Sequence, residues 1–434
     1  MVAFGSPAGA QGLIRDAEIE NTIRAYTTPL FNAAGLDPDV VKVYVMNDRV
    51  LNAFVTSGQN IFITTGVLMR AEKPNQIIGV LAHETGHIAG GHLARMSDEL
   101  RYATREAFAA QILGLLLAVG SGNAGAGAAV GMGGVHIAER SLLSYSRTQE
   151  ASADQAGVQF LDRTRQSSRG LLEFFQILGD QELVTSSRQD PYVRTHPLTR
   201  DRVEFVANHV ANSTLSNLPD SPQFVDYYKR MRAKLFGFIE PLDRTLKEYG
   251  ASDTSLPARY ARAVGYYRVS QLDKAIPLVD GLIAEEPKNP YFHELKGQML
   301  FENGRVKEAL APYQEMVRLA PNESLLRTGL AHVQIELNDP ALVKPALSNL
   351  NAALSADDSN PVTWRLAATA YGLDNQMGMS SLSLAEYNLR IGRLVDARGQ
   401  AARAERLLPR GSPGWIRAQD IQNEAKNQRE QRDR

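Results

Sequence analysis

The stretch His83-Glu84-Thr85-Gly86-His87 lies in a longer segment, 77–96, whose apolar residues recur at helical spacing. Residues four apart share one face of a helix, so His83 and His87 are placed to bind one zinc ion together. Zinc lowers the pKa of water toward neutrality, and Glu84 between the two imidazoles is placed to accept the proton. The stretch therefore predicts a helix with two metal ligands and a general base for attack on a peptide carbonyl.

A catalytic zinc site needs a third protein ligand, and the segment 145–157 (YSRTQEASADQAG) offers one. We predict a second helix here, in which Glu150 and Asp154 lie on one face among small residues. Glu150 is the predicted ligand. Asp154 is predicted to accept a hydrogen bond from a ligand imidazole, which fixes the imidazole tautomer and raises its basicity. The alternative is a solvated acidic face on which Arg147 pairs with Glu150.

With these motifs the chain resembles the zinc metallopeptidases that include HtpX and the CAAX prenyl endopeptidases, in particular their BepA-like periplasmic members with tetratricopeptide repeats. The resemblance extends over nearly the whole chain. It rests on the C-terminal repeats and on five segments: Asn52–Phe54, Ile63–Gly66, Val80–His87, Tyr145–Asp154 and Thr195–Arg202. It implies an α+β zincin-type (gluzincin) metalloprotease domain with a small sheet. It also implies one Zn2+ per chain held by His83, His87 and Glu150, with Glu84 as the general base.

The resemblance also gives roles to two residues near a segment flanked by proline, 190–197. His196 lies in this segment, and Arg202 follows it. The matching histidine of the family lies near the metal. It either occupies the open metal position in a resting state or stabilises the oxyanion once substrate enters. The matching arginine is expected to contact the substrate backbone. The alternative for both is a capped helix start at Thr195 or Thr199, with the arginine in a solvated first turn.

The composition limits the remaining chemistry. The chain has no cysteine, which excludes disulfides, thiol catalysis and cysteine zinc sites. Its 47 basic and 48 acidic residues give no indication of a nucleic-acid partner. Among the other histidines, His92 lies five residues after His87 and off the ligand face, so we predict a packed or half-exposed side chain without a role in the site.

The first residues resemble the end of an export signal. Ala8-Gly9-Ala10 has the small-residue pattern of a signal-peptidase site, although no charged or fully apolar segment precedes it. We interpret residues 1–14 as the remnant of a signal peptide, with a disordered leader as the alternative. The family resemblance favours export and a periplasmic location. No apolar run in the sequence is long enough to span a bilayer.

Between a helix predicted around residues 16–34 and the histidine helix, the pattern changes to that of β-strands. The segments 41–46, 51–56 and 60–65 are rich in β-branched residues and separated by turn residues. Three short strands beside the metal helix form a small sheet, and its outer edge is suited to hold a substrate strand by main-chain pairing. This favours an endopeptidase that acts on extended or unfolded segments.

The segment 107–138, between the two metal helices, is nearly free of charge and rich in glycine. Its apolar part of about a dozen residues is too short for a membrane span, which needs about 20. One interpretation is a mobile lid or hairpin that lies over the cleft or makes peripheral contact with a membrane. The other is a buried helix followed by a flexible linker.

From about residue 256 the chain repeats itself. Asp273-Lys-Ala275 is echoed by Lys307-Glu-Ala309 at a separation of 34 residues, with Pro287 and Pro321 at equivalent places, and the pattern returns near 392–409. This period is typical of tetratricopeptide repeats, whose stacked helix pairs form a groove for protein segments. We predict a protease domain over 15–250 and an all-α solenoid of about four repeats over 256–434, with a solvated or frayed end at 425–434.

The combined prediction is a zinc-dependent metalloendopeptidase that cleaves unfolded or misassembled proteins. By resemblance, it acts in the periplasm in quality control of outer-membrane protein assembly, and its repeats bind the assembly machinery. The alternative is a chaperone or scaffold with vestigial proteolysis, against which the intact Glu84 argues. An aminopeptidase would need an acidic site for the substrate amine, and no such motif precedes His83.

Overall fold

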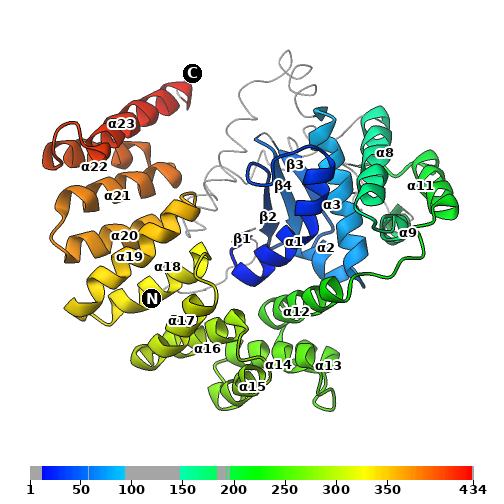
Figure 1. Cartoon of the computed structure of the whole chain (residues 1–434), viewed down its shortest axis with the longest axis horizontal. Coiled ribbons are helices and arrows are strands. Elements are labelled where there is room, and N and C mark those ends of the chain that lie inside the picture. The colour runs from blue at the N-terminus through cyan, green and yellow to red at the C-terminus, as the bar shows by residue number, and fades with distance from the viewer. Residues whose placement is uncertain (1–11, 57, 93–146, 183–191, 193–195, 433–434) are drawn as a thin grey trace. The chain divides into compact units, whose positions relative to one another are not determined.

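The structure is a computed structural model that describes residues 12–56, 58–92, 147–182, 192 and 196–432 (Figure 1). Residues 1–11 of the segment predicted as a leader, 1–14, lie outside the described residues, as does the whole segment predicted as a lid or linker, 107–138. The described residues form two compact units. The first comprises those up to 241 together with 255–261, and the second comprises 242–254 and 262–432.

The first unit contains a mixed four-stranded sheet with the order β1-β2-β4-β3. The three predicted strands are confirmed as β2 (Lys42–Met46), β3 (Ala53–Thr56) and β4 (Asn60–Thr64). The sequence analysis missed β1 (Leu13–Ile14), a two-residue strand counted there with the leader. Strands β2 and β4 are parallel, whereas β1 and β3 run antiparallel to their neighbours.

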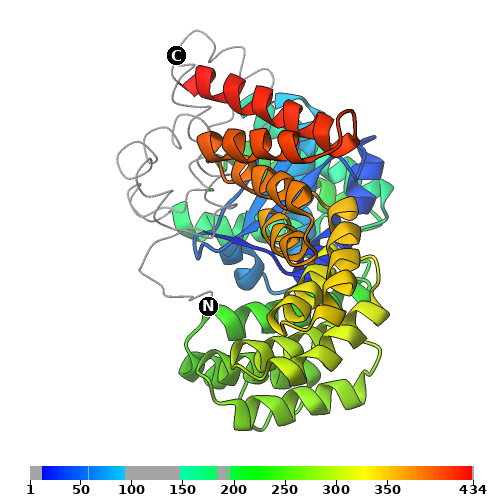
Figure 2. The same cartoon turned by 90° about the vertical axis from the view of Figure 1, so that its left-hand side faces the viewer.

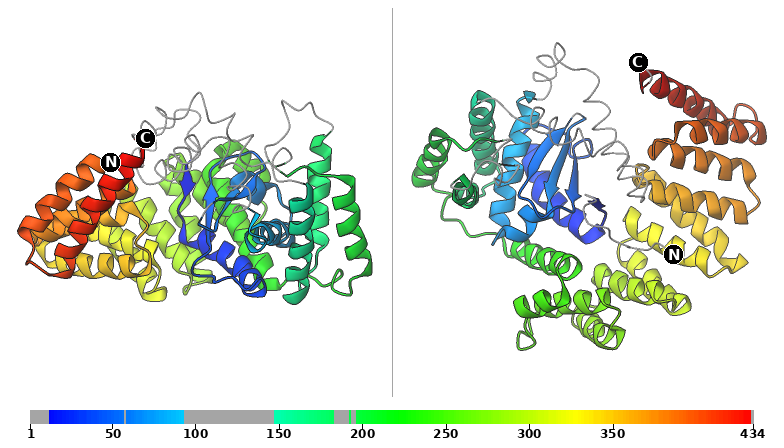
Figure 3. Two further views of the ribbon diagram at one scale, coloured as in Figure 1. Left: turned by 90° about the horizontal axis from the view of Figure 1, so that it is seen from above. Right: turned by 180° about the vertical axis from the view of Figure 1, so that it is seen from behind.

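Successive side chains of a strand point to opposite faces of the sheet, and the two faces differ in composition. One face adds Val45, Val55 and Ile61 to the main core, together with residues of α1 (Ala17–Ala33) and α3 (Pro74–Ala89), which contact each other (Figure 3). The other face carries a row of aromatic rings. Tyr44 stacks on Phe62 at 5.1 Å between ring centroids, and Phe54 stacks on Phe62 at 5.2 Å.

Helix α3 carries the histidine stretch and packs against the helix that holds Glu150 and Asp154. It begins with Pro74 and ends at Ala89, earlier than the apolar pattern to residue 96 suggested, because Gly90 and then Gly91 (φ +63°) turn the chain. The remaining helices of the first unit are α2 (Thr65–Arg70), α8 (Arg147–Arg163), α9 (Arg169–Glu182), α11 (Arg200–Asn212) and α12 (Pro222–Ile239).

Helices α3 and α8 approach each other closely, and two glycines allow this. A Cβ on Gly86 would lie 2.6 Å from the carbonyl oxygen of Ala153, and a Cβ on Gly157 would lie 3.3 Å from the backbone of Ala82. This approach brings the side chains of α8 next to those of His83 and His87. The glycine of the histidine stretch is thus a packing requirement of the site.

The second unit is a succession of helices, and the predicted solenoid is confirmed (Figure 2). The buried alanines of the repeat pattern, Ala275, Ala309 and Ala397, are fully buried at the crossings. Of the two predictions for the end at 425–434, fraying is wrong, because the last helix continues to residue 432 and buries Ala425. Solvation is confirmed for residues 426–430, which are exposed or half-buried. The helices are α13 (Leu242–Glu248), α14 (Leu256–Arg268), α15 (Leu272–Glu285), α16 (Pro290–Glu302), α17 (Val306–Leu319), α18 (Ser324–Glu336), α19 (Pro340–Ala356), α20 (Pro361–Leu373), α21 (Met377–Arg390), α22 (Leu394–Leu407) and α23 (Pro413–Arg432). Across the described residues, no helix has the length and apolarity needed to cross a membrane.

Candidate metal centre

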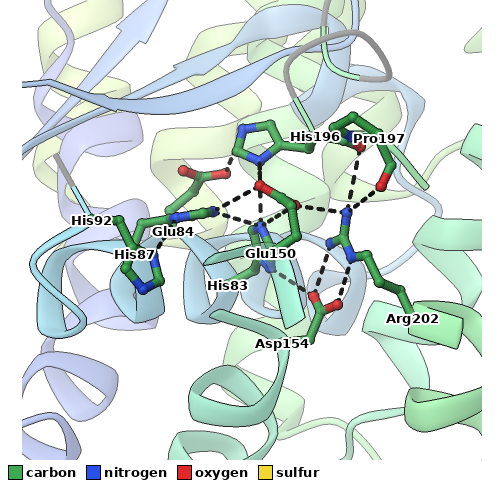
Figure 4. A network of polar contacts seen from close by, with 9 residues as sticks. All are labelled: His83, Glu84, His87, His92, Glu150, Asp154, His196, Pro197 and Arg202. Carbon is green, nitrogen blue, oxygen red and sulfur yellow. Dashed lines mark hydrogen bonds and ion pairs between the residues drawn. The ribbon is translucent and has the colours of Figure 1, made fainter. Parts of the chain in front are cut away.

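Four side chains from three parts of the first unit direct one ligand atom each to a common point (Figure 4). They are His83 and His87 of α3, Glu150 of α8, and His196, which precedes α11. The two helix imidazoles lie 3.1 Å apart at their Nε2 atoms. His196 Nδ1 lies 3.4 Å from His83 Nε2 and 3.0 Å from Glu150 Oε1. All four ligand atoms lie within 4.8 Å of one another, and all four residues are buried.

These residues fit a zinc ion. Zinc takes nitrogen and oxygen ligands at about 2.0–2.1 Å, so ligand atoms at the corners of a tetrahedron lie about 3.3 Å apart. The spacings of 3.0 to 3.4 Å between the imidazole and carboxylate atoms match that edge. The charge matches as well, because the carboxylates of Glu84, Glu150 and Asp154 are buried beside one buried guanidinium, that of Arg202. With neutral imidazoles the cluster carries a formal charge of −2, which a divalent cation neutralises.

Asp154 and Arg202 hold the ligands from behind. Asp154 Oδ1 lies 2.8 Å from His83 Nδ1, in the arrangement predicted for a carboxylate that orients a ligand imidazole. Arg202 donates to both carboxylate oxygens of Asp154, at 2.6 and 2.9 Å, and its Nη1 lies 2.7 Å from Glu150 Oε2. Nη1 also donates to the carbonyl oxygen of Pro197 at 3.0 Å. The guanidinium therefore joins α8, α11 and the segment that carries His196.

This placement excludes the simpler interpretations of the acidic and arginine residues. Glu150 is 1% exposed, so it does not belong to a solvated acidic face. Arg202 is 3% exposed, so it does not lie in a solvated first turn. Its N–H groups face protein carboxylates and carbonyl groups, which favours a role in positioning the ligands over direct contact with the substrate backbone.

Glu84 is buried in a way that suits a base. Its side chain is 0% exposed, and among the described residues neither carboxylate oxygen has a hydrogen-bond partner. His196 Nε2 lies 3.7 Å from Oε1. Burial raises the pKa of Glu84, because the charged form loses its solvation, and the neighbouring imidazoles only partly offset this. A carboxylate with a raised pKa accepts a proton more readily than an ordinary surface glutamate.

The other site residues differ from Glu84 because each has charged or hydrogen-bonded partners. Burial favours a raised pKa of Glu150, but His196 and the other two imidazoles hold it well below its usual value. Burial acts likewise on Asp154, where the hydrogen bonds from Arg202 and His83 prevail and lower the pKa. Burial lowers the pKa of His83, yet Asp154 and Glu150 outweigh this and raise it to about 9. Burial holds the pKa of His87 well below its usual value.

His196 is held by a residue that the sequence analysis did not single out. The backbone N–H of His196 donates to the carbonyl oxygen of Tyr192 at 2.7 Å. The ring of Tyr192 stacks on the imidazole at 4.5 Å between centroids, with 27° between the planes. Both side chains are 0% exposed. A tyrosine four residues before a histidine gives no sequence signal of such a contact without the fold.

His92 is packed, as expected, and lies off the ligand face, but the sequence analysis did not foresee that it contacts a ligand. The side chain is 2% exposed, and its Nδ1 lies 2.9 Å from His87 Nδ1. The glycine pair 90–91 was the available signal, because it ends α3 and turns the chain back toward the ligand helix.

Comparison with known proteins agrees with this geometry. The model of the family described as "Peptidase family M48" matches residues 15–210. Those residues form an M48 peptidase domain. A "Tetratricopeptide repeat" model matches residues 260–324 of the same chain. The M48 domain contains every residue of the metal centre, and the repeat match lies wholly outside it.

Curated relatives match long parts of the chain. The beta-barrel assembly-enhancing protease of Yersinia pestis is 26% identical over 376 residues, which cover 85% of this chain and 75% of that protein. The protein of the same name from Escherichia coli strain K12 is 25% identical over 413 residues, covering 93% and 82%. The metalloprotease YcaL of the same strain is 30% identical over 174 residues, covering 39% of this chain and 62% of its own. The chain is a zinc-dependent metalloendopeptidase that joins an M48 peptidase domain, residues 15–210, to tetratricopeptide repeats.

Proposed function

We propose that His83, His87 and Glu150 hold the zinc ion and that Glu84 is the general base. The convergence of four ligand atoms within 4.8 Å, next to a buried and unpartnered Glu84 carboxylate in the described part of the chain, carries this proposal. When bound, zinc polarises the peptide carbonyl and makes water a stronger acid. Asp154 keeps the proton of His83 on Nδ1, so that Nε2 faces the ion.

Glu84 is proposed to transfer a proton from the attacking water to the leaving amine. In the proposed reaction its carboxylate accepts a proton from the attacking water and later donates it to the nitrogen of the leaving amine, which completes hydrolysis of the peptide bond. The burial of Glu84 supports both steps, because a carboxyl group in an apolar site is readily protonated. The low exposure of the site also excludes bulk water from the reacting groups.

His196 has two candidate roles, a resting-state ligand and an oxyanion donor. Its Nδ1 atom lies among the other ligand atoms, 3.0 Å from Glu150 Oε1, which supports a resting state in which His196 occupies the fourth metal position. Movement of the ring would open that position for substrate, and His196 would then stabilise the oxyanion. We propose that Arg202 serves this change by holding the Pro197 carbonyl group, at 3.0 Å, in the segment that carries His196.

The sheet offers a place for an extended substrate. Strand β3 is the outermost strand of the described sheet, on the side away from β1, and it contacts α3. Main-chain pairing along β3 would place a peptide alongside the metal helix. Such pairing requires an extended segment, so we propose that the substrates are unfolded or misassembled proteins.

The relatives' names suggest the cellular setting. Because two similar proteins are called beta-barrel assembly-enhancing proteases, we propose that this chain acts in the periplasm on outer-membrane proteins during assembly. The repeats imply binding of a protein partner, and we propose the outer-membrane assembly machinery as that partner. Peripheral membrane contact through 107–138 stays a prediction for residues outside the described part.

The substitution Glu84→Gln tests the proposed base. It removes the proton acceptor and preserves the size of the side chain, so zinc content should stay at the wild-type level. Cleavage of an unstructured protein such as casein should fall by at least roughly two to three orders of magnitude. Full cleavage by the purified, zinc-loaded variant would exclude Glu84 as the base. It would also revive the alternative that the chain acts mainly as a scaffold.

A further inference from the structure

The two helix imidazoles of the metal centre are supported from behind by different groups. His83 Nδ1 faces a carboxylate, that of Asp154, at 2.8 Å. His87 Nδ1 faces a second imidazole, that of His92, at 2.9 Å. His92 is 2% exposed and meets the His87 ring edge to face, at 5.0 Å between centroids and 77° between planes. A buried imidazole at hydrogen-bond distance on the side away from the ligand cluster is suited to orient its neighbour.

We propose that His92 is a positioning residue that fixes the tautomer and the ring orientation of His87 through a hydrogen bond between the two Nδ1 atoms. The inference rests on the proposed role of His87 as a zinc ligand. His87 Nε2 points to the cluster, 3.1 Å from His83 Nε2 and 3.4 Å from Glu150 Oε1. A neutral imidazole that offers Nε2 to a metal carries its proton on Nδ1.

The proton count then defines the state of His92. Nδ1 of His87 is the donor, so Nδ1 of His92 must supply the lone pair that accepts. His92 is therefore neutral and carries its own proton on Nε2. In the opposite arrangement, with the proton on His92 Nδ1, His87 would have to accept at Nδ1 and hold its proton on Nε2, where it would block the metal. With a metal at Nε2 of His87, the contact therefore holds His87 in its ligand-competent tautomer.

The backbone after α3 is built to admit this ring. A Cβ on Gly90 would lie only 2.4 Å from His92 Nε2 and 2.8 Å from two ring carbons. Gly91 has φ +63°, a left-handed conformation that side chains other than glycine rarely adopt. The pair therefore ends the helix, turns the chain back and leaves the space in which the imidazole reaches His87.

The different supports give the two ligands different electronic character. Asp154 is a charged acceptor held by Arg202 at 2.6 and 2.9 Å, and it makes His83 a more basic ligand. His92 is a neutral acceptor, so it orients His87 without adding a negative charge to a cluster that already holds three buried carboxylates. A carboxylate in its place would have raised the cost of burying the site before the metal binds.

The test is the zinc affinity of the full-length protein, measured by competition with a chromophoric chelator after the metal has been removed. His92→Phe preserves a buried ring and removes the acceptor, so zinc should bind about ten- to a hundredfold more weakly. His92→Asn can place its Oδ1 where the imidazole Nδ1 lies, so we expect it to restore affinity to within a few-fold of wild type. His332→Phe, a histidine of the repeats, is the matched control and should bind zinc like the wild type.

Gly90→Ala provides a second, independent variant, because it leaves His92 in the chain and displaces its ring. It should also weaken zinc binding, and the d–d absorption of the cobalt-substituted protein should change in His92→Phe and Gly90→Ala but not in His332→Phe. Wild-type affinity in His92→Phe would overturn the inference. An equal loss in His92→Phe and His92→Asn would also overturn it, because it would indicate packing instead of the hydrogen bond. A folded wild-type chain that binds no zinc would reject the ligand assignment itself.

Discussion

Two clusters of buried charge, one in each compact unit, show how differently the units use such groups. In the first unit, Glu84 is fully buried without a hydrogen-bond partner among the described residues, and the cluster around it holds three carboxylates against one guanidinium. In the second unit, Glu386 is 3% exposed, but it accepts hydrogen bonds from Arg417 at 2.6 and 3.0 Å and forms an ion pair with Arg390. The second cluster is complete by itself, whereas the first needs a cation. The first cluster is therefore suited to chemistry, whereas the second stabilises the fold.

Removing a ligand should have the largest effect. Glu150→Ala deletes the carboxylate that lies 3.0 Å from His196 Nδ1, and a site of three protein ligands has none to spare. We expect the purified variant to lose zinc on dialysis and to show no detectable cleavage. Metal content measured by mass spectrometry checks this. Asp162→Ala, an α8 residue that contacts His209 instead of the cluster, is the control. Wild-type zinc binding in Glu150→Ala would remove this residue from the ligand set.

Truncating the chain after the first unit tests whether the two units have independent functions. A chain that ends after Ala261 keeps residues 255–261, which belong to the first unit and include Tyr260, a donor to buried Glu18 at 2.6 Å. We expect it to fold and to cut an unstructured peptide, yet to lose cleavage of native substrate in cells. Circular dichroism and the two cleavage assays measure this. Loss of folding would show that the repeats stabilise the protease, and undiminished cleavage in cells would contradict recruitment by the repeats.

His196→Ala tests whether the ligand cluster is closed at rest. If His196 occupies the fourth metal position, its removal should raise basal cleavage and increase self-degradation during storage. If it acts mainly as the oxyanion donor, cleavage should instead fall about a hundredfold. Initial rates on an unstructured peptide distinguish the two outcomes. The geometry favours the rise, because Nδ1 already lies among the ligand atoms. An unchanged rate would contradict both roles.

Substitution of Glu386, in the buried charge cluster of the second unit, should have the smallest effect, and this effect should be on stability alone. Burial favours a raised pKa of Glu386, but Arg417 and Arg390 hold it below the ordinary value of 4.5. A lowered pKa stabilises the folded state above the unfolded pKa, and this contribution is lost as the pH falls through the folded value. Glu386→Gln should therefore reduce the free energy of unfolding by about 1–3 kcal/mol at neutral pH. The difference from wild type should disappear in acid.

Denaturant unfolding at several pH values measures the Glu386 effect, with zinc content as a second readout that should not change. Glu308→Gln is the matched control, because Glu308 pairs with Arg305 at an exposed position where ion pairs contribute little. A pH-independent difference for Glu386→Gln would point to packing. A loss of zinc would contradict the separation of the two clusters.

The parts of the site that were predictable lie close together in sequence. His83, Glu84 and His87 follow from helical spacing, and Glu150 with Asp154 follows from the same rule on a second helix. The strands and the repeats were predictable for a similar reason, since periods of two and of 34 residues are local patterns. Neither the burial of Arg202 nor the contact between His87 and His92 follows from helical spacing, so these were not predictable.

The sequence by itself determined which residue types could bind zinc and the helices that carry most of them, because those depend on neighbours along the chain. Only the tertiary structure decided which ligands meet and which residues hold them in place. The absence of a Cβ on Gly86 lets α8 approach α3, and the glycine pair 90–91 lets His92 fold back. Arg202 reaches Asp154 across 48 positions of sequence. Such contacts depend on the packing of distant backbones, and no local pattern encodes the distance between them.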